Sequence, residues 1–148
     1  MSTTASLVVS IIATAAVFFV VLWLAIGYLI ASVSGWRRLR ALYGTSPSPM
    51  EGATSTFAGY VGVSRFRGRA LIAGSTPAGL YLNVVAPFRI GAGPVLIPWH
   101  DISVSAPSGS PISLVTFDFP KARTNLRAPQ SVAGRLLEGR SGDSRQFP

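Results

Sequence analysis

The sequence predicts a single transmembrane α-helix followed by a small, mainly β domain, a barrel or sandwich, with a C-terminal capping helix. Three observations predict this fold class. Residues 7–33 carry no charged side chain; as a helix they would extend roughly 40 Å, against roughly 30 Å of hydrocarbon in a bilayer. Between residues 54 and 120, short β-rich runs alternate with turns that contain glycine and proline. Residues 130–138 then return to helical spacing.

These observations set the domain boundaries. We expect a short external N-terminus (1–6), the transmembrane helix (7–33), a basic juxtamembrane segment with a linker (34–53), a cytoplasmic β-domain with its closing helix (54–138) and a flexible tail (139–148).

The flanks of the first helix predict its orientation. Arg37, Arg38 and Arg40 follow the helix, whereas residues 1–6 contain no basic residue. Because basic flanks stay in the cytoplasm, the N-terminus should lie outside and the β-domain inside. Trp36 would then lie in the headgroup layer.

A cleaved signal peptide is the alternative interpretation of the apolar helix. Ala25 and Ala31 offer weak cleavage sites. Signal peptides, however, have a basic start and an apolar stretch of about 7–15 residues, and this run is about twice that length. We therefore expect an anchor that stays in the lipid bilayer.

Small residues recur every four positions at two places in this region. Ser10 and Thr14 belong to one set, and Gly27, Ala31 and Gly35 form the other. The two sets point about 140° apart on a helix. They predict helix packing against other integral membrane subunits on two faces; the alternative is that small residues are simply common in membrane spans.

The β-domain is expected to contain strands at 56–63, 66–73, 79–85, 95–102 and 112–119, with turns at 91–94 and 108–111. The closing helix should bury Val132, Ala133, Leu136 and Leu137 on one face. Ser131 would cap this helix, and Gly139 would end it.

The composition and the spacing of the titratable residues argue against an enzyme or a metal-binding protein. The chain has no cysteine and one histidine, so thiolate chemistry is excluded and the usual metal-ligand sets are lacking. His100 and Asp101 are adjacent, and on a strand they would point to opposite faces. We expect no enzymatic activity, no metal and no cofactor. The net charge is +8, but no nucleic-acid-binding motif accompanies it, so we expect no nucleic-acid partner.

Arg65, Arg67 and Arg69 alternate along one expected strand and would place three guanidinium groups on one face. Together with Arg89, they are candidates for contact with an anion or a partner. The alternative is a solvated face, or an edge strand that charge protects from aggregation. Trp99 is expected in the core with a local hydrogen bond.

Two segments carry a family resemblance. The run Gly79-Leu-Tyr-Leu, the segment Leu96-Ile-Pro-Trp-His-Asp-Ile102 and the closing helix resemble the bacterial PH-like or GRAM-like arrangement. With Ser34-Gly-Trp-Arg-Arg-Leu39, they resemble small single-pass bacterial membrane proteins over most of residues 34–137. The resemblance implies a PH-like β-domain at the bacterial inner (cytoplasmic) membrane and implies no activity. The sparse acidic content departs from the family pattern.

Two functions remain open. The first is a non-catalytic accessory or scaffolding subunit of a larger membrane protein complex, which would hold its neighbours through the helix and the domain together. The alternative is a membrane-anchored PH-like domain that recognises anionic lipid headgroups.

Overall fold

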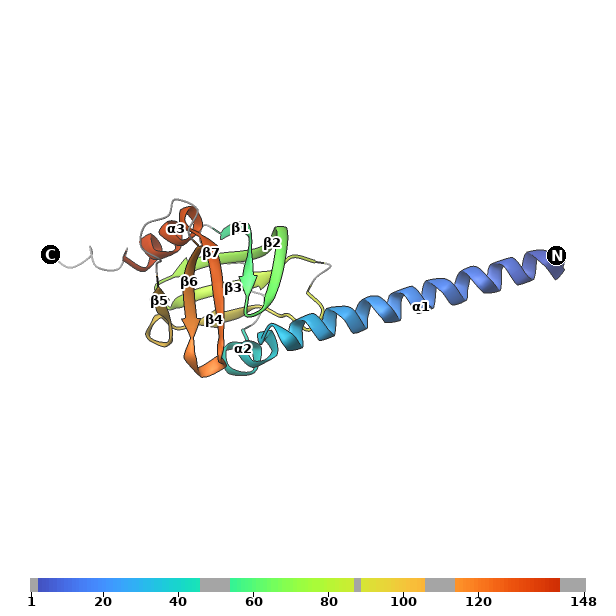
Figure 1. Cartoon of the computed structure of the whole chain (residues 1–148), viewed down its shortest axis with the longest axis horizontal. Coiled ribbons are helices and arrows are strands. Elements are labelled where there is room, and N and C mark those ends of the chain that lie inside the picture. The colour runs from blue at the N-terminus through green and yellow to red at the C-terminus, as the bar shows by residue number, and fades with distance from the viewer. Residues whose placement is uncertain (1–2, 46–53, 87–88, 106–113, 142–148) are drawn as a thin grey trace.

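The computed structural model describes residues 3–45, 54–86, 89–105 and 114–141 (Figure 1). Its first element, α1 (Thr3–Val33), is a long apolar helix that extends away from a β-domain (Figure 1). Within the described ranges, α1 is the one helix long and apolar enough to cross a membrane. The long N-terminal helix expected from the sequence is therefore confirmed, and it begins at Thr3 rather than at residue 7.

A second helix, α2 (Trp36–Tyr43), follows α1 after a sharp turn at Gly35, whose φ of 78° is left-handed. We expected a basic segment and linker over residues 34–53, so this helix is a correction. Its apolar side chains recur at helical spacing between the arginines. Two of them, Trp36 and Leu39, are fully buried in the core of the domain.

Trp36 does not lie in the headgroup layer as expected. Its exposed fraction is 0%, and its indole N–H donates a hydrogen bond to the carbonyl oxygen of Gly93 at 2.8 Å. Its ring lies 6.3 Å from that of Phe66, between centroids. The turn at Gly35 is the reason, because it directs α2 into the domain instead of along the membrane surface.

The β-domain is one curled antiparallel sheet of seven strands in the order β4-β3-β2-β1-β7-β6-β5 (Figure 1). Burial alternates along β6 as it does in a strand with one face on the core. The strands are β1 (Thr54–Val61), β2 (Ser64–Thr76), β3 (Gly79–Val84), β4 (Val95–Ile97), β5 (Ser103–Ser105), β6 (Leu114–Phe119) and β7 (Thr124–Pro129).

The expected strand at 95–102 is wrong. β4 ends at Ile97, and a 3₁₀-helix, η1 (Trp99–Asp101), separates it from β5. Pro98 explains the break, because proline has no N–H to donate to the ladder. Trp99 is partly buried, and its N–H donates to the carbonyl oxygen of Thr76 at 2.8 Å.

Strand β7 was missed by the sequence analysis. The short 3₁₀-helix η2 (Pro120–Ala122) and Arg123, with a φ of 52°, reverse the chain after β6. This turn brings Leu126 and Ala128 of β7 into the core, where both are fully buried.

The closing helix α3 (Gln130–Ser141) packs against β2, β6 and β7 and buries Val132, Ala133 and Leu136, as expected. It starts before Ser131, so that residue is not its cap. Nor does Gly139 end it. A Cβ at Gly139 would lie 2.5 Å from the side chain of Ser75 on β2, so this glycine lets the helix approach the sheet. The flexible tail was expected at 139–148; residues 139–141 belong to α3 instead, and residues 142–148 lie outside the described residues.

The burial of Trp36 predicts a measurable contribution to stability. Replacing Trp36 with Phe should lower the free energy of unfolding of the β-domain by about 1–3 kcal/mol, because the carbonyl of Gly93 loses its donor in a dry site. Urea unfolding of the full chain in detergent, followed by circular dichroism, measures this change. Val63→Ala, at a side chain that is 78% exposed, is the control and should change stability by less than about 0.5 kcal/mol. An equal effect of the two substitutions would contradict the role of Trp36.

Candidate functional site

A cavity of about 320 Å³ lies where the end of α1 meets the β-domain. Most of its lining is apolar, and it comes from segments far apart in the sequence. The side chains that matter most below are Trp23, Ile26 and Ile30 of α1 and Arg65, Phe66 and Arg67 of β2.

The length of α1 bears on where this cavity would lie if the helix spans a bilayer. A helix of 31 residues extends about 46 Å, which is about 16 Å longer than the hydrocarbon core. A spanning α1 would therefore tilt, or extend beyond the hydrocarbon at one end. The turns of α1 that line the cavity are those nearest the β-domain.

A cation–π contact lies at the same end of α1. The guanidinium carbon of Arg37, on α2, lies 4.9 Å from the ring centroid of Tyr28 on α1. Tyrosine rings and long basic side chains are typical of the membrane interface, because each has an apolar body and a polar end. Arg37, Arg38 and Arg40 are all exposed beside this end of α1, as flanking arginines should be.

The small residues at the end of α1 contact this chain itself. A Cβ at Gly27 would lie 3.1 Å from the Cβ of Ile90, and a Cβ at Gly91 would lie 3.1 Å from that of Ala31. Gly35 forms the turn after α1 and is not part of the helix. The face expected to receive another membrane helix is thus occupied, over its last two turns, by the segment that precedes β4.

The other small-residue set remains uncovered. Ser10 and Thr14 lie on the exposed part of α1, and the Thr14 hydroxyl donates to the carbonyl oxygen of Ser10 at 2.9 Å. This bond satisfies the hydroxyl inside the helix.

The arginines of β2 do not form one continuous ladder as expected. Phe57 of β1 pairs with Leu71 and Gly59 with Phe66; between these pairs β1 has one residue, whereas β2 has the four residues 67–70. Gly68, with a φ of 65°, lies within this bulge. All three arginines are exposed, but only Arg65 and Arg67 line the cavity, and Arg69 is not part of the lining.

The positive charge at the cavity is not neutralised within the described chain. The ion pairs among the described residues all involve Asp101, which does not line the cavity, and the arginines there have no carboxylate partner. Arg65 instead lies 5.7 Å from the ring centroid of Tyr60, and Arg127 of β7 lies 6.0 Å from the same ring. Arg89 is exposed in the turn just before Ile90.

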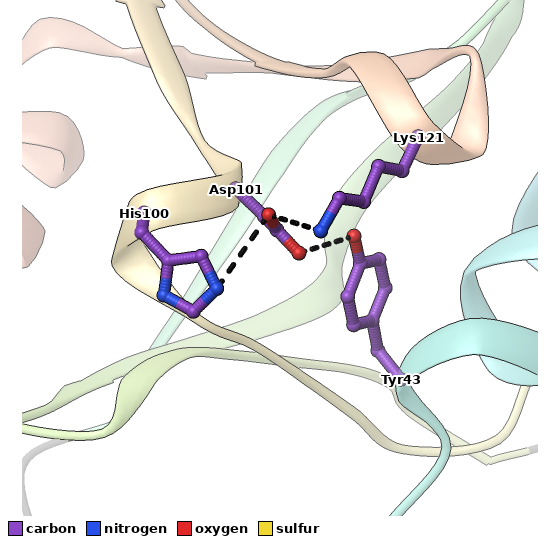
Figure 2. Close-up of polar contacts among 4 residues, drawn as sticks. All are labelled: Tyr43, His100, Asp101 and Lys121. Atoms are coloured by element: carbon purple, nitrogen blue, oxygen red, sulfur yellow. Dashed lines mark hydrogen bonds and ion pairs between the residues drawn. The ribbon is translucent and has the colours of Figure 1, made fainter.

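A separate polar cluster surrounds Asp101 (Figure 2). Lys121 donates to its Oδ1 at 2.7 Å, and the hydroxyl of Tyr43 donates to its Oδ2 at 2.9 Å. His100 Nε2 lies 3.6 Å from Oδ1 because the two residues share a 3₁₀ turn. The expectation that His100 and Asp101 point to opposite faces of a strand is therefore wrong. The cluster ties α2 to the turns η1 and η2.

The charge states in this cluster suit a structural contact. The hydrogen bond from Lys121, together with that from Tyr43, holds the pKa of Asp101 below its ordinary value. Burial and the neighbouring carboxylate raise the pKa of Tyr43. An ionised carboxylate held by two donors and a neutral phenol provide no activated nucleophile. No group of three or more possible metal ligands occurs in the part of the chain that is described.

Sequence reasoning found the arginines of the site and missed its apolar wall. Trp23, Ile26 and Ile30 belong to a helix that is apolar all round, so their spacing does not distinguish them. Ile90 carried no signal in the sequence either.

No protein-family model, curated protein or solved structure matches the chain.

The Asp101 cluster predicts a dependence of stability on pH. Because its folded-state pKa is lowered, Asp101 contributes stability above its ordinary value of 3.8, and this contribution is lost as the pH falls through the lowered value. Unfolding in urea should therefore show a smaller loss of stability between about pH 7 and about pH 3 in Asp101→Asn than in the parent chain. Asp118→Asn is the control and should keep the parent's acid loss. If Asp101→Asn lost as much stability at acid pH as the parent chain, the contribution assigned to Asp101 would be contradicted.

Proposed function

We propose that the chain is a non-catalytic, membrane-anchored β-domain that recognises anionic lipid headgroups where its helix leaves the bilayer. One observation carries the proposal. Arg65 and Arg67, which have no carboxylate partner among the described residues, line the same cavity as Trp23 and Ile30 of the apolar helix. Cationic side chains at the depth of phosphate groups attract anionic lipids.

The anchor function of α1 has structural support. Ala31 is 3% exposed and packs into the domain core, and the helix supplies one wall of the cavity. A cleaved leader would not need such contacts with the mature domain. We propose a single-pass anchor in a bacterial inner (cytoplasmic) membrane, with its N-terminus outside and its β-domain in the cytoplasm, because the flanking arginines favour that orientation.

The curled sheet and its closing helix support a PH-like domain, which is the fold that the sequence resemblance implies. The carboxylate of Asp101 is held by Lys121 and Tyr43, which supports a structural role for this cluster and a non-catalytic domain.

An accessory subunit of a membrane complex is the second candidate. Its specific support is that the face of Ser10 and Thr14 stays uncovered by this chain. The other expected face is occupied by Ile90 and Gly91 at Gly27 and Ala31, so it is not free to receive another helix there. The lipid function is therefore supported by more of the geometry.

The lipid preference can be measured on the full-length chain in vesicles of neutral phosphatidylcholine and anionic phosphatidylglycerol. Mass spectrometry of the lipids that remain with the chain in mild detergent gives the ratio of anionic to neutral lipid. At about 1 kcal/mol for each arginine, Arg65→Gln with Arg67→Gln should lower the preference for anionic lipid by about 30-fold. High salt should lower it as well.

The matched control removes the same charge elsewhere. Arg135→Gln with Arg140→Gln takes two arginines from α3, at the far side of the domain from α1 (Figure 1). This pair should leave the preference nearly unchanged. Equal losses in the two double variants would indicate a general effect of net charge and would reject recognition at the cavity. A parent chain with no anionic preference would favour the accessory function instead.

A further inference from the structure

The cavity at the junction is apolar where it meets α1 and cationic where it meets β2. We infer that it binds one acyl chain of an anionic phospholipid, with the phosphate of that lipid held by Arg65 and Arg67. This inference rests on the proposed function and deepens it, because it adds a site for the lipid tail to a surface for the headgroup.

The wall of the cavity fits an apolar ligand. Trp23, Ile26 and Ile30 of α1 line it together with Phe66 and Ile90. The three side chains of α1 are 40–47% exposed, so an apolar ligand in the cavity would cover apolar surface that this chain leaves open to solvent. Its volume of about 320 Å³ lies at the lower end of the range for small-molecule sites, about 300–1,000 Å³.

The proposed membrane anchor brings one kind of apolar occupant to the cavity. A bilayer around α1 supplies hydrocarbon chains, and Trp23, Ile26 and Ile30 line the cavity on that helix. A single hydrocarbon chain is much narrower than a helix from a partner, which is about 10 Å wide.

Charge complementarity identifies the lipid as anionic. Arg65 and Arg67 lie on the β2 side of the cavity, and neither has a carboxylate partner in the described chain. Guanidinium groups form strong, directional hydrogen bonds with phosphate oxygens. The left-handed Gly68 follows Arg67 directly within the bulge.

The cavity can be filled by a larger side chain from either of two sides, α1 or β2. Ile30 offers a position on α1, and Ala70, which is 8% exposed, offers one on β2. Ile30→Trp and Ala70→Leu should each occupy the space of the acyl chain. The matched controls are Leu29→Trp, at a neighbouring side chain that is 61% exposed and outside the lining, and Ala58→Leu on the exposed face of β1.

The experiment titrates phosphatidylglycerols of increasing acyl length into the delipidated full-length chain in mild detergent, with native mass spectrometry as the readout. Affinity should rise with chain length and then level off when the cavity is full. Ile30→Trp and Ala70→Leu should weaken binding of the long-chain lipid by at least about tenfold, and the controls should stay within about twofold. Glycerol phosphate and inorganic phosphate should not compete at equal concentration.

The outcomes separate this site from the headgroup function. If both cavity variants bind long-chain phosphatidylglycerol as the parent does, while the double arginine variant loses its anionic preference, the acyl site is rejected and headgroup recognition stands. The acyl site would also be rejected if glycerol phosphate, which has no acyl chain, displaced the long-chain lipid at equal concentration. If one cavity variant fails to fold, by circular dichroism, the other decides the result. Binding of phosphatidylcholine as tight as that of phosphatidylglycerol would overturn the assignment of an anionic lipid to this site.

Discussion

The burial of α2 in the β-domain is the constraint on which the rest of the structure depends. Only Ser34 and Gly35 separate α1 from α2, and Ser34 is 1% exposed. The hydroxyl of Thr124, at the start of β7, donates to the carbonyl oxygen of Ser34 at 2.9 Å. With Trp36 fully buried two residues later, the helix enters the domain directly, without an intervening linker.

This connection explains how exposed arginines of the domain are held at a defined place relative to α1. A domain on a flexible linker would present its arginines to the membrane in many orientations. Here α1 and the sheet share a core that includes Ala31 and Leu39. Arg65 and Arg67 are therefore held beside the end of the helix, and the cavity between them and Ile30 exists only while helix and domain stay docked.

Much of the architecture could be predicted from the sequence, and the failures have physical causes. The apolar length of α1 and the spacing of α3 were sufficient to identify both helices. α2 was missed because its three arginines were interpreted as a membrane flank, although Trp36 and Leu39 lie at helical spacing. β7 was missed because it depends on a turn with a left-handed Arg123. The arginines of the site were identified, but the bulge at Gly68, and the contact of Ile90 with Gly27, arise only from tertiary packing.

The fixed geometry of helix and domain is the central claim, and a distance measurement tests it most directly. The chain has no cysteine, so spin labels can be placed at Val33→Cys on α1 and Ser131→Cys on α3, both at exposed positions. In bilayers, pulsed electron paramagnetic resonance should give one narrow distribution of the distance between the two labels. This distribution should broaden when Trp36→Ala removes the buried side chain. A broad distribution in the chain with Trp36 intact would contradict the account.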